Sequence, residues 1–294
     1  MCWKTGITWN WNKMKKKNLK LGTRIIKACN EADFSQVRSH IPPIFQTVNY
    51  DYKDSDEGFA IFKGDQKGYL YSRHGNPTTD LLANLVALLE EGESGVAAAS
   101  GMAVISALMS AMLEPGDEIV SSKNIYGGTR SFLLDFMHKF GVKTHFVDIT
   151  NLAQVEENIT PKTKILYTET LGNPNLVIAD IAALANRARK RDLLFCVDST
   201  FTPPPVLQPL KLGADVVLHS ATKYIGGHGD LIGGVLVGEK TIVDQVAHAL
   251  KLFGGTLSPF NAWLAVRGLK TLNLRVKRQC KNALQLAGFL QEQK

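Results

Sequence analysis

An acid and a lysine, two residue types that can act together in catalysis, each follow an apolar run of the sequence. Asp198 ends the run LLFCVD, and Lys223 lies 25 residues further along, just after ADVVLHS. A carboxylate that closes a hydrophobic strand is costly to bury without a partner. Asp198 is therefore interpreted either as a cap on the turn STFTPPP or as a fixed anion that holds a protonated heterocycle. Lys223 is likewise either a solvated charge or a nucleophilic amine.

Small or polar residues follow three other predicted strands: Ser100, Gly101 and Met102 in AAASGMAV, then Tyr126, and then Glu169 with Asn173. In an open parallel sheet, ligands bind at the carboxyl ends of the strands. A small-residue turn that opens a helix is either a phosphate cradle or an ordinary tight turn. The glycine pattern GxGxxxG after Lys223 has one residue more than the GxGxxG fingerprint of dinucleotide-binding proteins. The phosphate-binding motif GxxxxGK[ST] is absent from the sequence.

Pyridoxal phosphate (PLP) would account for all of these residues. Its protonated ring acts as an electron sink, which requires an anion at the ring nitrogen. Asp198 would face that nitrogen, Lys223 the aldehyde carbon, and Tyr126 would lie flat on the ring. Ser220 and Thr222, which flank Ala221 just before the lysine, would reach the phosphate.

Only a sheet of parallel strands would bring these residues together, and the sequence predicts one. From Thr78 onward, short apolar runs alternate with helical patterns as far as ADVVLHS. This alternation indicates an α/β fold, with a mostly parallel sheet covered by helices on both faces. Residues 14–75 have weak periodicity and several turn signals, which predicts an N-terminal arm. Residues 1–13 are interpreted as a non-native or upstream extension.

Composition and charge argue against several classes of protein. The 294 residues are 45% hydrophobic and 21% charged, and no apolar run approaches the roughly 18 residues of a membrane span. The N-terminus lacks the apolar core of a signal peptide, so we expect a cytoplasmic protein without a membrane partner. Residues 1–30 and 261–294 are basic while 31–260 are net acidic. This argues against nucleic acid as a partner, and the basic ends are interpreted as solvated arms.

The cysteines and histidines do not predict a disulfide or a metal site. Cys2, Cys29, Cys196 and Cys280 are far apart and form no CxxC motif. This spacing is typical of a protein in a reducing compartment. His219 and His228 flank Lys223, but no nearby carboxylate has the spacing of a metal motif. We therefore expect no metal.

Longer motifs identify a family. They are GYLYSRHGNPTTDLLANLVALLEEGE, AAASGMAV, NIYGGT, TETLGNPNL, VDSTF, QPLKLGADVVLHSATKYIGGHGD and LSPFNAWLAVRGLKTL. From Ser39 onward the chain resembles the Cys/Met-metabolism (trans-sulfuration) family of PLP enzymes. It is most like the methionine γ-lyase, cystathionine γ-lyase and O-acetylhomoserine sulfhydrylase branches. The resemblance implies the aminotransferase-like fold type I, with a PLP-binding domain at 76–257 and the start of a truncated C-terminal domain at 258–294.

The resemblance also implies a role for each site residue. Lys223 would be the Schiff-base lysine, Asp198 the partner of the ring nitrogen, and Tyr126 the stacking aromatic and the acid for the leaving group. Asn173 would lie near the ring hydroxyl, with Glu169 in support. The phosphate would be bound in the loop of Ser100 by the amides of Gly101 and Met102, by Ser220 and Thr222, and by Tyr71 and Arg73 of a neighbouring subunit. A homodimer or homotetramer with shared active sites is therefore expected.

The activity implied is that of a PLP-dependent C–S lyase. Methionine, homocysteine or cystathionine would give an α-keto acid, ammonia and a thiol by α,γ-elimination. The alternative is a γ-replacement enzyme, such as O-acetylhomoserine sulfhydrylase or cystathionine γ-synthase. An inactive PLP-binding remnant is the alternative of another class.

Two departures from the family pattern bear on substrate binding. Methionine γ-lyases commonly carry a cysteine two residues after the stacking tyrosine, where this chain has Gly128. No residue matches the arginine of the family's C-terminal domain that binds the substrate carboxylate. Arg267, Arg275 and Arg278 are expected, by resemblance, to lie on helical segments that lead away from the cofactor.

Overall fold

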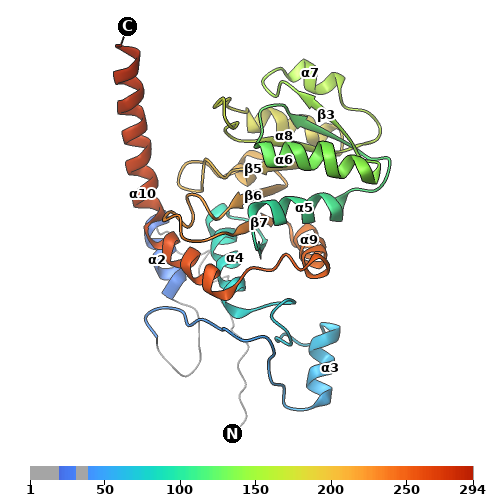
Figure 1. Cartoon of the computed structure of the whole chain (residues 1–294), viewed down its shortest axis with the longest axis vertical. Helices are drawn as coiled ribbons and strands as arrows, with labels where there is room; N and C mark the ends of the chain where they lie inside the picture. The colour runs from blue at the N-terminus through green and yellow to red at the C-terminus, as the bar shows by residue number, and fades with distance from the viewer. Residues whose placement is uncertain (1–19, 31–38, 294) are drawn as a thin grey trace.

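The fold is organised around one seven-stranded sheet (Figure 1). The structure is a computed structural model that describes residues 20–30 and 39–293, so the extension predicted at residues 1–13 lies outside the described residues. The strands are β1 Ser94–Ala98, β2 Glu118–Ser122, β3 Lys143–Val147, β4 Thr163–Glu169, β5 Leu194–Asp198, β6 Val216–Ser220 and β7 Gly234–Gly238. Their order across the sheet is β1-β7-β6-β5-β4-β2-β3.

Helices connect the strands and cover the sheet. They are α2 Leu21–Asn30, α3 Ser55–Lys63, α4 Pro77–Glu90, α5 Gly101–Met112, α6 Gly127–Ser131, α7 Leu152–Glu157, α8 Ile181–Lys190, α9 Lys240–Phe253 and α10 Pro259–Gln291. A π-helical turn and a 3-10 turn, η1 Phe132–Phe136 and η2 Met137–Phe140, continue α6, and the 3-10 turn η3 Pro209–Leu212 precedes β6. Among the described residues, no helix is both long enough and apolar enough to cross a membrane.

The sheet is mostly parallel, which confirms the predicted fold class. Strands β3, β2, β4, β5 and β6 pair in parallel. Only β7 runs the other way, and it pairs antiparallel with both β6 and β1. The sequence analysis did not predict β7, because GVLVG is only five residues long and has a glycine at each end. Its insertion between β1 and β6 places the start of α5 beside the end of β6.

Both faces of the sheet are buried, since alternate residues of each strand point to opposite sides. In β6, Val216 and Leu218 join a core cluster built around α5 and α9, whereas Val217 packs with α4 and α10. In β5, Cys196 points to the α5 side and Val197 to the opposite side, toward α8. This alternation sends the last residues of β4, β5 and β6 toward α5.

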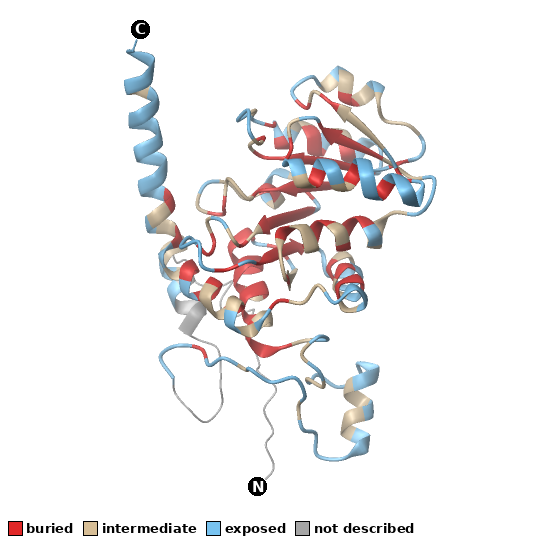
Figure 2. Cartoon of the chain, in the orientation of Figure 1, coloured by how far each residue is buried: buried red, intermediate tan, exposed pale blue. Residues whose placement is uncertain are grey.

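Helix α10 is the longest element and lies only partly on the body. Its first half packs on α4, and its last buried residue is Val276. Beyond that residue the helix projects from the body and is almost wholly exposed (Figures 1 and 2). The arm contains α3, which has no buried residue. Asn76 ties the arm to the body because its side-chain amide donates to the carbonyl of Phe45 (2.8 Å) and to the hydroxyl of Tyr50 (2.8 Å).

Candidate functional site

Three neighbouring strands end in polar residues that face the same side of the sheet. Glu169 ends β4, Asp198 ends β5 and Ser220 ends β6. Glu169 and Asp198 are direct partners in the β4–β5 register. Each lies an even number of residues after a side chain packed on the α5 side, so all three point toward α5. They border a cavity of about 380 Å³ at the carboxyl ends of the strands.

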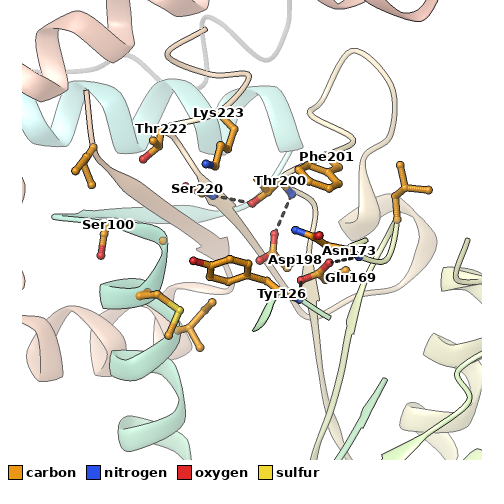
Figure 3. Close-up of a pocket in the computed structure, with 15 residues that line it drawn as sticks. Ser100, Tyr126, Glu169, Asn173, Asp198, Thr200, Phe201, Ser220, Thr222 and Lys223 are labelled. Atoms are coloured by element: carbon orange, nitrogen blue, oxygen red, sulfur yellow. Dashed lines mark hydrogen bonds between the residues drawn. The ribbon is translucent and has the colours of Figure 1, made fainter. Parts of the chain in front are cut away.

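Ten of the twelve predicted site residues line this cavity (Figure 3). They are Ser100, Gly101, Met102, Tyr126, Glu169, Asn173, Asp198, Ser220, Thr222 and Lys223. Tyr71 and Arg73 do not line it. Tyr71 forms an isolated bridge with Asn49, and the Arg73 guanidinium donates to the carbonyl of Lys251 (2.8 Å). The role implied for these two residues is in a neighbouring subunit, and it stays a prediction.

Glu169 joins two loops that carry other cavity residues. Its Oε1 accepts the backbone N–H of Tyr126 (2.6 Å), and its Oε2 accepts the backbone N–H of Asn173 (3.1 Å). Burial, followed by the nearby negative charge of Asp198, raises the pKa of Glu169 to about 8. The two amide donors oppose this rise, because they favour the ionised form. Glu169 thus fixes the backbone of the tyrosine and the asparagine, in addition to lining the cavity.

Asp198 is a buried carboxylate on the cavity wall. Its relative exposure is 8%, and its Oδ1 accepts the backbone N–H of Thr200 (2.9 Å). Burial raises the pKa of Asp198, while the hydrogen bonds from Thr200 and the charge of His219 act in the opposite direction. An acid in this setting gains stability from a cation placed beside it, because the cation offsets the cost of burying the charge.

The two histidines that flank the lysine do not line the cavity. His219 points to the opposite face of the sheet, where its Nε2 lies 2.6 Å from Oε1 of Glu90 in α4. The His228 ring lies 2.8 Å from the carbonyl of Gly226. Among residues 20–30 and 39–293, no group of three or more His, Cys, Asp and Glu side chains could hold a metal ion.

The start of α5 forms the side of the cavity opposite Asp198. The Ser100 hydroxyl caps the helix by accepting the N–H of Ala103 (3.0 Å). The amides of the first helical residues, Gly101 and Met102, have no carbonyl partner within the helix, as is general for the first turn. A Cβ at Gly101 would lie 3.0 Å from Cβ of Ser220, so glycine permits this close approach. An anion at this position would meet free N–H groups and the positive end of the helix dipole.

Lys223 lies on the turn that follows β6, not on a helix. Its side chain is exposed on the cavity wall, and its amine points toward Ser220 and the cavity (Figure 3). Thr222, beside it, exchanges hydrogen bonds with Gly233: its hydroxyl accepts the N–H of Gly233 (3.1 Å). The lysine therefore faces the same space as Asp198 and the start of α5, which distinguishes it from a solvated surface charge.

Five lining residues were not predicted as site residues: Ile105, Leu171, Thr200, Phe201 and Ile232. Thr200 has a clear structural role, because its hydroxyl accepts the N–H of Ser220 (2.8 Å) and so links the ends of β5 and β6. Thr200 and Phe201 lie within the VDSTF motif, which could have drawn attention to them. Leu171 likewise lies within the TETLGNPNL motif, whereas Ile105 and Ile232 have no such signal, since their patterns are those of ordinary core positions.

The cavity fits PLP in its chemistry. A buried acid suits a protonated ring nitrogen, the free amides of α5 suit a phosphate, and Lys223 suits an aldehyde. The apolar side chains of Met102, Ile105 and Phe201 line the same space and suit the faces of an aromatic ring.

Comparison with known proteins gives the same answer. The chain is 45% identical over 255 residues to an L-methionine γ-lyase of Pseudomonas putida, a match that covers 86% of this chain and 64% of the relative. It is 40% identical over 254 residues to an O-succinylhomoserine sulfhydrylase of Pseudomonas aeruginosa, covering 86% and 63%. The chain therefore spans less than two thirds of the length of these curated relatives.

A solved structure shows the same fold. It is described as an O-acetylhomoserine (thiol)-lyase of Campylobacter jejuni, and it carries a pyridoxyl-lysine phosphate group. The TM-score is 0.86 at 31% identity, with 92% of this chain and 76% of that chain covered. The family profile described as "Cys/Met metabolism PLP-dependent enzyme" matches residues 22–294. Together with a cavity suited to PLP, this match shows that the chain belongs to the family of Cys/Met metabolism PLP-dependent enzymes.

Proposed function

We propose that this chain is a PLP-dependent C–S lyase of sulfur amino acid metabolism. The substrates proposed are methionine, homocysteine and cystathionine, and the products are an α-keto acid, ammonia and a thiol, or hydrogen sulfide where homocysteine is the substrate. The observation that carries the proposal is that Asp198, Lys223 and the start of α5 border one cavity at the strand ends. The 45% identity to a methionine γ-lyase favours elimination from this group of substrates.

Each cavity residue has a proposed task. When bound, PLP supplies a protonated ring that withdraws electrons from the substrate's α-carbon. The Asp198 carboxylate would hold the proton on the ring nitrogen. The Lys223 amine would hold the cofactor at its aldehyde carbon until the substrate amine takes its place there, and the released Lys223 amine would then accept the proton from the substrate's α-carbon. The Tyr126 hydroxyl gives a proton to the departing sulfur.

The remaining residues bind and orient. The amides of Gly101 and Met102, in the loop of Ser100, and the hydroxyls of Ser220 and Thr222 bind the phosphate. Asn173 lies beside the ring hydroxyl. Glu169 accepts hydrogen bonds from the backbone N–H groups of Tyr126 and Asn173. It thereby fixes the positions of the proposed proton donor, Tyr126, and of Asn173 beside the ring hydroxyl.

The experiment that tests this function supplies PLP and measures both products, the keto acid and the thiol, with each of the three substrates. Both products should appear in equal amounts with at least one substrate, and Lys223→Ala should form neither. Cofactor binding with no product from any of the three substrates would contradict the lyase and leave γ-replacement or a PLP-binding protein without activity.

γ-Replacement is the second candidate. It is favoured by the 40% identity to a sulfhydrylase and by Gly128, which stands where methionine γ-lyases commonly carry a cysteine. The two activities share their first steps and separate when a late intermediate meets a thiol or water. Incubation with O-acetylhomoserine and a thiol discriminates them: a sulfhydrylase forms a thioether amino acid, whereas a lyase forms the keto acid.

We further propose a cytoplasmic homodimer or homotetramer in which neighbouring subunits share active sites. Tyr71 has a relative exposure of 38% and lies outside its own cavity with Arg73, which leaves both available to a neighbour. Mixing inactive Lys223→Ala subunits with Arg73→Ala subunits should restore part of the activity. If the sites are not shared, the mixture will have only the activity of its separate components.

A further inference from the structure

The turn that carries Lys223 is held partly by its own backbone and by the burial of Ala221 and Ile225. Residues 221–226 form neither helix nor strand, and the turn lies between β6 and a second irregular stretch. Three short-range backbone hydrogen bonds close it: the N–H of Lys223 donates to the carbonyl of Ser220 (3.1 Å), that of Gly226 to the carbonyl of Ala221 (2.8 Å), and that of Gly227 to the carbonyl of Lys223 (2.7 Å). The turn is also held from outside, by the hydrogen bonds between Thr222 and Gly233 and by a contact with α10, and these contacts bear on the position of the lysine amine.

Arg275 of α10 binds the turn immediately after the lysine. Its Nη1 donates to the carbonyl of Tyr224 (2.8 Å), and its Nη2 is 3.4 Å from the carbonyl of Ile225. The same guanidinium is anchored on its own helix, because Nη2 donates to the carbonyl of Gly268 (2.9 Å) and Nε to the hydroxyl of Thr271 (3.0 Å). One planar group thus fastens the lysine turn to α10.

The backbone around this contact is shaped to accept it. A Cβ at Gly268 would lie 2.5 Å from the carbonyl oxygen of Ile225 and would overlap that of Gly226, so glycine lets α10 touch the turn directly. Gly227 has a φ of +77°, and a Cβ there would overlap the guanidinium of Arg275. Substitution at Gly268 would therefore force the turn and α10 apart, and substitution at Gly227 would displace the guanidinium from the turn.

The guanidinium of Arg275 uses its hydrogen bonds for the lysine turn and for its own helix. It forms no ion pair with a carboxylate of the described residues, and all four of its hydrogen-bond partners are neutral oxygens. Burial lowers its pKa. Hydrogen bonds from a charged donor are stronger than neutral ones, and the rigid fork of arginine can reach several carbonyls at once, which a lysine cannot.

We propose that Arg275 is a positioning residue that holds Lys223 at the cavity through the carbonyls of Tyr224 and Ile225. This inference rests on the proposed role of Lys223 and adds Arg275 to the residues on which that role depends. Arg275 does not line the cavity and would not touch substrate or cofactor.

The test compares Arg275→Met and Arg275→Lys with Arg278→Met, which removes the same charge from an exposed position of the same helix. The first readout is amide hydrogen exchange of residues 221–227 in the cofactor-free protein. We expect exchange there to be about ten- to a hundredfold faster in Arg275→Met, to be intermediate in Arg275→Lys and to be unchanged in Arg278→Met, since two charge-assisted hydrogen bonds are lost.

The second readout is the pH midpoint of the visible absorbance of the PLP-bound protein, which reports the lysine linkage. We expect a shift of half a pH unit or more in Arg275→Met and none in Arg278→Met. Wild-type exchange and a wild-type midpoint in Arg275→Met would overturn the inference. If Arg275→Met does not fold, the same pair of wild-type results in Arg275→Lys would overturn it.

Failure of the proposed function has a different signature. If the wild-type protein forms no covalent bond between PLP and Lys223, the proposed role of the lysine fails while the exchange measurement still tests the contact of Arg275 with the turn. If the covalent bond forms and neither readout responds to Arg275, only the positioning role fails.

Discussion

Glu169 should make the stability of the cofactor-free protein fall as the pH rises. Burial and the charge of Asp198 raise its pKa from 4.5 to about 8, so the folded protein binds a proton that the unfolded chain has already lost. The stabilisation from this proton is complete below pH 4.5 and is lost as the pH rises through about 8. At about 1.4 kcal/mol for each tenfold change in proton affinity, the upper limit of this contribution is about 5 kcal/mol.

Glu169→Gln isolates this effect, because an amide remains neutral and resembles the protonated acid in shape. The assay is urea unfolding of the cofactor-free wild-type and variant proteins at several pH values from 5 to 8. Asp80, whose burial raises its pKa to about 6, is common to both proteins and cancels in their difference. Asp198, whose pKa burial also raises, does not cancel, because Glu169→Gln removes its acidic neighbour; making the same comparison in an Asp198→Asn background removes this contribution. We expect the wild-type protein to lose several kcal/mol relative to Glu169→Gln between pH 5 and pH 8.

A difference that stays constant over this pH range, or that changes with the opposite sign, would refute the reasoning. Asp198→Asn provides a second check. This substitution removes a negative charge beside Glu169 and so lowers the pKa of Glu169. The variant should therefore lose the stabilisation at a lower pH than the wild-type protein does.

The remaining predictions concern the cavity. Asp198→Asn should retain part of the PLP binding but lose most of the elimination rate, because an unprotonated ring is a poor electron sink; near-normal keto-acid production would contradict the role of Asp198. Gly128→Ala places a Cβ 2.5 Å from Cε1 of Tyr126, so the ring must move by roughly 1 Å from its position here, and kcat/KM should change by about 10-fold without being abolished, since methionine γ-lyases commonly carry a cysteine at this position. Gly127→Ala meets no atom within 4 Å and is the matched control, and equal activities of the two variants would exclude this steric effect.

Much of the sheet could be predicted from the sequence because most strands are buried on both faces. The run KTKILYTE became β4 and LLFCVDST became β5, since near-continuous apolar runs of this length are typical of parallel strands. Strand β7 and helix α9 were not predicted. The signal of β7 is weak, because its glycines are required by packing: a Cβ at Gly234 would overlap the backbone of Ser100.

Ten site residues could be placed from motifs and from the rule that ligands bind at strand ends, but their connections could not. Glu169 binds the amide of Tyr126, 43 residues away, because β2 and β4 are neighbours in the sheet. No local pattern specifies that adjacency.

Arg275 was expected to lie on a helical segment leading away from the cofactor. Its helix α10 does project from the body beyond Val276 (Figure 1), but the Arg275 guanidinium donates to the carbonyl of Tyr224 in the lysine turn. This contact depends on the close approach of α10 at Gly268, which a helical periodicity alone does not reveal.

The central claim is that Lys223 forms the covalent bond with PLP, and one measurement tests it directly. The PLP-loaded protein is reduced with borohydride, digested and analysed by peptide mass spectrometry. We expect the visible absorbance to disappear and the pyridoxyl group to be found on Lys223. An adduct on another lysine, or no adduct with excess PLP present, would contradict it.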